Sequence, residues 1–190
     1  MDKNKNIIII RHFETFKDEN NNERIYYNKS SRKLKKYLEF IEKYINNNSN
    51  AKNSQKINKI KIFTSNHDRT IITSLIICNG LKSEIISNRL KSIEIFEPVI
   101  TDILDRDPHK KKHKEICKKI TNDINNKLNK DTLYLFITHS SLICNIFNCF
   151  CKLYSNEYKK VSKSHIHRYS LSYIKKTKKI CEYDFNINMK

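Results

Sequence analysis

The sequence predicts a single domain over residues 1–190, a three-layer α/β sandwich with a mostly parallel central sheet flanked by helices. Strand-like and helical segments alternate along the chain, as in βαβ units. The segments "IIII" (7–10) and "TLYLFI" (132–137) are apolar almost throughout, which is typical of strands buried on both faces of a parallel sheet. With 190 residues, 38% of them hydrophobic, the chain is long enough for one core.

Each expected element of the first half follows from a local pattern. Residues 30–45 carry apolar side chains at helical spacing, whereas 57–63 alternates as a strand does. Residues 70–81 continue as a helix that we expect to end near Gly80, the only glycine, as a C-cap. Residues 93–96 predict a short strand stopped by Pro98. The polar stretches 17–24 and 46–56 are expected to be surface loops.

The second half repeats the alternation. Residues 109–128 place Ile116, Ile120, Ile124 and Leu128 on one helical stripe. After the strand 132–137, the segment "THSSLICNIFNCF" predicts another apolar helix. Residues 169–174 and 180–185 are expected to form a terminal strand pair.

The composition limits the function classes. Apolar runs fall short of the roughly 20 residues that span a membrane, and the apolar run near the N-terminus is too short for a signal peptide, so we expect a cytoplasmic protein without a membrane partner. The six cysteines lie mostly in apolar runs without a CxxC pair, which indicates free thiols in a reducing compartment. Cys149, Cys151, His165 and His167 do not have the spacing of common zinc modules. The net charge of +18 indicates anionic partners or a solvated basic surface.

Three predicted strands end in polar residues suited to one kind of chemistry. Arg11 and His12 follow the first strand, Arg69 follows the second after a short interval, and His139 follows 132–137. Because ligands of open α/β sheets bind outside the carboxyl ends of the strands, these side chains should converge. Guanidinium groups bind phosphate oxygens bidentately, and a histidine beside them can attack phosphorus.

These motifs resemble those of the histidine phosphatase (phosphoglycerate mutase-like) superfamily. "RHFET", "TSNHDRTIIT" and "FITHSSLI" follow the order of that family's RHG-E/T start, its S-x-x-x-R-T-x-x-T segment and its late S/T-H-G-G. The resemblance covers nearly the whole chain and implies the family's fold, a phosphohistidine intermediate and no cofactor or metal.

The resemblance also implies roles for individual residues. His12 would be the nucleophile, while Arg11, Arg69 and His139 would hold the phosphoryl oxygens and stabilise the transition state. Thr15 and Ser140 would be secondary substrate-binding residues. Glu94 is the first choice for the proton donor to the leaving group, and Glu97 in the same segment is the second.

Some residues depart from the family pattern. Phe13 stands where the family has glycine, Ser140 and Ser141 replace the late glycine pair, and Asp18 stands about where many members have a phosphate-contacting asparagine. A carboxylate at position 18 would repel a phosphoryl group unless it is paired with a basic side chain or points away. His67 is a candidate for the mouth of the site. His109 and His113, among lysines, indicate a solvated basic face.

The preferred interpretation is a metal-independent phosphatase that hydrolyses phosphomonoesters of small molecules or phosphoproteins. The nearest alternative is a phosphoglycerate mutase-type phosphotransferase, although mutases of the superfamily are generally longer, with segments that keep water from the phosphoenzyme. A third hypothesis is a catalytically weak, basic polyanion-binding member, with nucleic acid contacted through surface charge alone. The sequence leaves the oligomeric state open.

Overall fold

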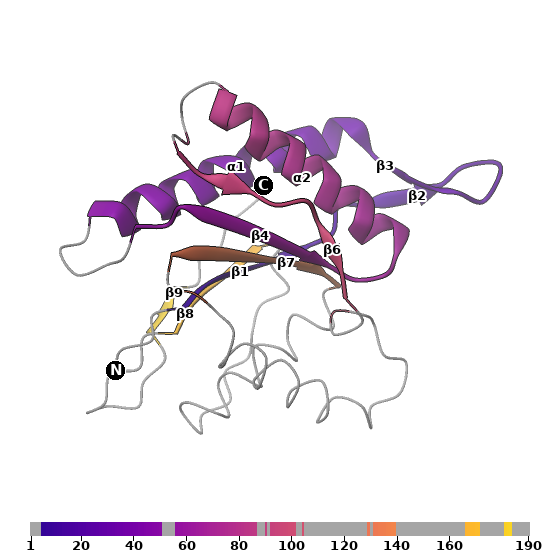
Figure 1. Ribbon diagram of the computed structural model, residues 1–190. Coiled ribbons are helices and arrows are strands. Elements are labelled where there is room, and N and C mark those ends of the chain that lie inside the picture. The colour runs from indigo at the N-terminus through magenta and orange to yellow at the C-terminus, as the bar shows by residue number, and fades with distance from the viewer. Residues whose placement is uncertain are drawn as a thin grey trace, which may run out of the picture.

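The central element is a seven-stranded sheet in the order β5-β4-β7-β1-β8-β9, with β6 also paired to β4 (Figure 1). The computed structural model describes residues 5–50, 56–86, 90, 92–101, 104, 129, 131–139, 166–171 and 181–183. The strands of this sheet are β1 (Lys5–Arg11), β4 (Lys59–Thr64), β5 (Glu94–Ile95), β6 (Val99–Ile100), β7 (Thr132–Thr138), β8 (Ile166–Leu171) and β9 (Cys181–Tyr183).

The pairing confirms a mostly parallel sheet. β7 lies between β1 and β4 and is parallel to both, and β4 is also parallel to β5 and β6. β8 runs antiparallel to β1 and to β9, so the predicted terminal strand pair is present, with β8 beginning three residues earlier than expected. β6, which directly follows Pro98, was not predicted, because two residues are too short to show a period.

Two long helices, α1 (Tyr27–Asn50) and α2 (Asp68–Ile86), cover one face of the sheet (Figure 1). Ile8 and Ile10 of β1 belong to the core beneath these helices. Ile7 and Ile9 point to the opposite face because side chains alternate along a strand, and they are fully buried as well. The helices expected over 109–128 and after residue 138 fall outside the described residues. An α/β fold with a mostly parallel sheet is therefore established, and the second helical layer stays a prediction.

Both helices are longer than predicted. α1 continues through residues 46–50, so the loop predicted for this segment is wrong. These asparagine-rich residues extend a helix that is anchored in the core just before them by the buried side chains of Tyr44 and Ile45. α2 runs six residues past Gly80, so Gly80 is not a C-cap. A Cβ at Gly80 would lie 3.0 Å from Leu38 Cδ1, which indicates that glycine is present to let α2 pass close to α1.

The surface loop expected over 17–24 is confirmed for residues 18–22, which form the turn of a hairpin, whereas residues 17, 23 and 24 belong to its strands. β2 (Thr15–Lys17) and β3 (Glu23–Ile25) pair antiparallel as a separate sheet beside the helices (Figure 1). The Asp18 carboxylate holds the turn, because it accepts hydrogen bonds from the backbone N–H groups of Asn20 and Asn22 and pairs with Arg24 at 2.8 Å. Side chains of this type favour turns by bonding their own backbone.

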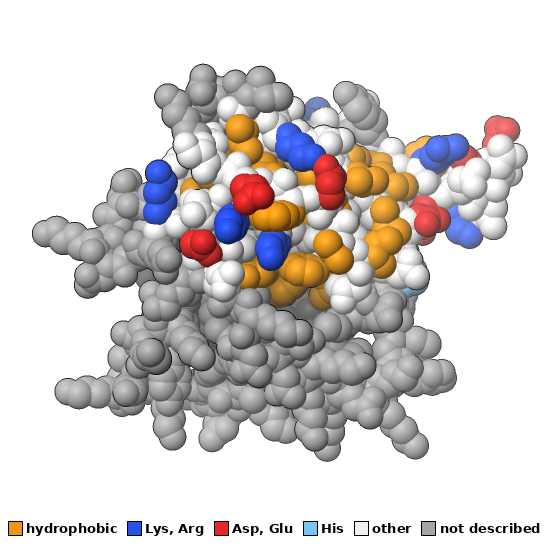
Figure 2. All heavy atoms as spheres, in the orientation of Figure 1, with side chains coloured by type: hydrophobic (Ala, Val, Ile, Leu, Met, Phe, Trp, Pro, Cys, Tyr) orange, Lys and Arg blue, Asp and Glu red, His pale blue; other side chains and the backbone are white. Residues whose placement is uncertain are grey.

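Neither of the described helices is long and apolar enough to cross a membrane. On the helix-covered side of the molecule, acidic and basic side chains are interspersed with apolar ones (Figure 2).

Candidate active site

The carboxyl ends of β1, β4 and β7 lie at the same edge of the sheet. Arg11 at the end of β1 pairs with Thr138, and Thr64 at the end of β4 pairs with Ile137. The chain stays in register just beyond the strands, where the His12 N–H donates to the Thr138 carbonyl at 3.0 Å. The parallel register thus brings the residues that follow three distant segments to one place.

His12 is held in a single orientation. Its Nδ1 lies 2.6 Å from the Phe13 carbonyl oxygen. Because a carbonyl only accepts, Nδ1 must carry a proton, and in the neutral ring Nε2 then has the free lone pair. Burial lowers the pKa of His12 below its ordinary 6.5, against the opposing hydrogen bond to Phe13. The guanidinium groups of Arg69 and Arg11 also lower it, so the site favours a neutral imidazole.

His139 is positioned by a chain of hydroxyl groups. The Thr70 hydroxyl donates to backbone carbonyls, so it can only accept from the Ser65 hydroxyl, 2.8 Å away. Ser65 Oγ is then left to accept from His139 Nε2, at 3.2 Å. The buried His139 ring stands edge-on to His12, with ring centroids 5.2 Å apart. His67 packs against the same ring at 4.8 Å.

The two arginines of the motifs flank His12. Arg69 lies in the first turn of α2, and its Nη1 pairs with Glu23 Oε1 at 3.6 Å, while its backbone N–H donates to Glu23 Oε2 at 3.1 Å. The Nε atoms of Arg11 and Arg69 are buried, and neither has a hydrogen-bond partner among the described residues. A buried N–H group without a partner is unfavourable, so these two donors are suited to an anionic acceptor.

The Phe13 side chain points away from this cluster. It is fully buried in the core under the helices and stacks on Tyr37, with ring centroids 5.7 Å apart. The Phe13 N–H donates to the buried Thr73 hydroxyl at 3.0 Å, and that hydroxyl donates to the Arg69 carbonyl. Phe13 therefore ties the loop after β1 to α2 without filling the space around His12.

The structure does not bring either expected proton donor to His12. Glu94 pairs with Lys59, at the start of β4, and the site lies beyond the other end of that strand, roughly 17 Å away at about 3.3 Å per residue. Glu97 is exposed and forms an ion pair with Lys82, which lowers the pKa of the Glu97 carboxyl. The Glu97 carboxylate also contacts Cys78 Sγ at 3.8 Å, and Cys78 is nine residues after Arg69 along α2, roughly 14 Å at about 1.5 Å per residue. Neither placement supports a role in proton transfer at His12.

Three other residues were expected at or near the site. Thr15 is the first residue of β2 and pairs with Ile25 of β3. The Asp18 carboxylate bonds within its own hairpin turn and is paired with Arg24, which lowers the pKa of the carboxyl group. Asp18 therefore has the basic partner that would keep it from repelling a phosphoryl group. Ser140 lies outside the described residues.

Glu23 is the site residue that sequence reasoning missed. Its carboxylate contacts Arg69, and its negative charge opposes part of the lowering of the His12 pKa. The stretch 17–24 contains no periodic apolar pattern that would reveal a strand at Glu23. The turn residues Asp18 and Asn21, the latter with a left-handed φ of 63°, were the available signal for a hairpin.

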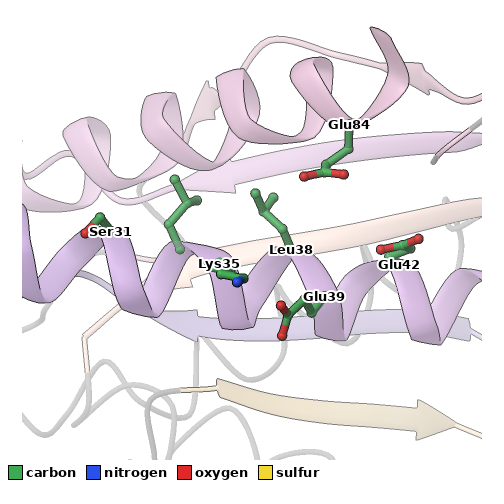
Figure 3. Close-up of a pocket in the computed structure, with 7 residues that line it drawn as sticks. Ser31, Lys35, Leu38, Glu39, Glu42 and Glu84 are labelled. Carbon is green, nitrogen blue, oxygen red and sulfur yellow. The ribbon is translucent and has the colours of Figure 1, made fainter. Parts of the chain in front are cut away.

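A hollow between α1 and α2 has a mostly acidic lining (Figure 3). Its polar residues are Glu39, Glu42, Glu84, Lys35 and Ser31, and its apolar residues are Leu34 and Leu38. Three carboxylates against one lysine make this hollow unsuited to a phosphoryl group. No group of three or more metal-ligating side chains occurs among the residues that the structure describes.

Neither the family models nor the curated proteins contain a match to this chain. The likeness to the histidine phosphatase superfamily accordingly rests on the three motifs.

Proposed function

We propose that the protein is a phosphatase that hydrolyses phosphomonoesters through a covalent phosphohistidine at His12, without a metal. The observation that carries the proposal is an imidazole whose Nδ1 is engaged by the Phe13 carbonyl, so that Nε2 is the nitrogen left to react, beside two arginines whose buried Nε atoms lack a partner among the described residues. A nucleophile and an anion site adjoin one another in this arrangement.

The chemistry follows from these positions. The phosphoryl oxygens would bind Arg11 and Arg69, which would bring phosphorus to His12 Nε2. The P–N bond then forms as the P–O bond to the leaving group breaks, and the guanidinium charges stabilise the transferring group. Water subsequently attacks phosphorus and releases inorganic phosphate. His139 would bind a phosphoryl oxygen as an imidazolium, through Nδ1–H, because its Nε2–H already donates to Ser65.

The substrate class is a dianionic monoester of a small molecule or a phosphoprotein. The net charge of +18 would steer such anions towards the protein. The proposal includes the phosphoglycerate mutase-like form of the fold, with a second helical layer on the face of the sheet opposite α1 and α2.

The test is turnover of p-nitrophenyl phosphate with EDTA present, by wild type, His12→Ala and His12→Asn. We expect activity in wild type and none in either variant, together with a phosphoenzyme whose N–P bond is stable to base and labile to acid. Activity in the two variants equal to that of wild type would refute the assignment. Thermal unfolding of the three proteins controls for folding.

A further inference from the structure

We infer that Glu23, carried to the site by the β2–β3 hairpin, is the proton donor for the leaving group and then the base that activates water. The inference rests on the proposed function. It gives to a residue of the hairpin the role that the motifs had suggested for Glu94 or Glu97.

Position is the first argument. The Glu23 carboxylate lies against Arg69, through both the guanidinium group and the backbone N–H. Because Arg69 is one of the two arginines proposed to hold the phosphoryl group, the carboxylate adjoins the proposed anion site. Of the two glutamates between His12 and Glu23, Glu14 is paired with Lys33 at 2.9 Å, and Glu19 is exposed in the hairpin turn.

The hairpin explains how Glu23 comes to face α2. Glu23 pairs across the hairpin with Lys17, and side chains of directly opposed residues lie on the same face. The hairpin is closed by Asp18 and is anchored by the Tyr26 N–H, which donates to the Glu14 carbonyl at 3.2 Å. Glu23 is about one-quarter exposed, so a substrate and water can both reach it.

The contacts of Glu23 suit a proton transfer at this place. In the free protein its carboxylate contacts the Arg69 guanidinium group at 3.6 Å, whereas Lys17 Nζ donates to Asn21 Oδ1. A phosphoryl group bound to Arg69 would therefore lie beside Glu23, where a proton can pass between the carboxyl group and the leaving oxygen.

The proton then follows a balanced path. As the P–O bond breaks and the P–N bond forms, the leaving oxygen takes the proton from the Glu23 carboxyl group and departs as an alcohol. The Glu23 carboxylate next accepts a proton from water, whose oxygen forms a bond to phosphorus while the P–N bond to His12 breaks. Inorganic phosphate leaves, and Glu23 is again protonated.

A purely structural role is the competing explanation, because Glu23 also accepts the Arg69 N–H in the first turn of α2. Glu23→Gln separates the two roles, since the amide oxygen can keep that hydrogen bond but the amide cannot transfer the proton. Glu19→Gln is the matched control: it makes the same change of charge on an exposed residue of the same hairpin.

The experiment measures the burst of p-nitrophenolate and the steady-state hydrolysis of an alkyl phosphate. p-Nitrophenolate leaves without a proton, so Glu23→Gln should retain the burst and accumulate phosphoenzyme while its steady-state rate falls. With the alkyl phosphate, kcat/KM should fall by about 10² to 10⁴-fold, the usual worth of general-acid catalysis. Glu19→Gln should behave as wild type.

The outcomes distinguish the two proposals. If Glu23→Gln matches wild type, or loses the burst and the alkyl phosphatase activity by the same factor, the inference about Glu23 is overturned while the phosphohistidine mechanism stands. If wild type forms no phosphoenzyme that depends on His12, the proposed function fails and the inference fails with it.

Discussion

Phe13→Ala should be severely destabilising. Phe13 has no exposed surface and stacks on Tyr37 within the core under α1 and α2. Burying a phenyl side chain is worth about 1.5–3 kcal/mol, and a cavity would add to its loss. Substitutions of this type in well-packed cores lower the free energy of unfolding by about 3–5 kcal/mol. For a domain of this size the corresponding fall in Tm is roughly 6–20 °C.

The assay is urea unfolding, with the free energy taken from the midpoint and slope of each transition. Phe16→Ala is the control, because Phe16 is 40% exposed and its ring packs against that of Tyr26, which is exposed as well. The control should lose about 1 kcal/mol or less. If the two variants were equally stable, Phe13 would not be a core residue, and the argument that it leaves the space around His12 open would fail.

Three more results are expected. Because burial and Arg69 lower the pKa of His12, the acid limb of kcat/KM should lie below pH 6.5, and a limb above 6.5 in the pH–rate profile would contradict this. Thr73→Val should lower the free energy of unfolding in urea by about 1–3 kcal/mol, since the Phe13 N–H would lose its acceptor, and an unchanged midpoint would exclude that bond. Gly80→Leu should cost about 1–3 kcal/mol in the same measurement, because its Cβ would already be 3.0 Å from Leu38 Cδ1; no loss would show that the helices separate easily.

The sheet was largely predictable because its strands carry strong local signals. Four consecutive isoleucines and the segment 132–137 can be buried on both faces only in the middle of a sheet, and the structure places β1 and β7 there. The ends of the helices were less predictable. Gly80 has the residue type of a C-cap, but contact between α1 and α2 decides its role, and a contact between distant segments leaves no local pattern.

The positions of His12 and Arg69 were predictable for a related reason. Parallel strands in register end at one edge of a sheet, so residues that follow buried strands must meet. Glu94 could not be placed in the same way. Its strand has two residues and pairs with the first part of β4, and nothing in so short a segment fixes which end of a neighbouring strand it will join.

The anion site and the hairpin are connected by charge. Buried guanidinium N–H groups without partners destabilise the folded chain, which an anion would relieve on binding. A carboxylate beside Arg69 reduces this destabilisation in the free protein. Glu23 supplies that carboxylate from a hairpin that contributes little to the core. Selection for stability in the free protein and for proton transfer in the complex would then act on the same glutamate. For this reason the Glu23→Gln experiment has to distinguish a loss of proton transfer, seen in the reaction rates, from a loss of stability of the folded protein.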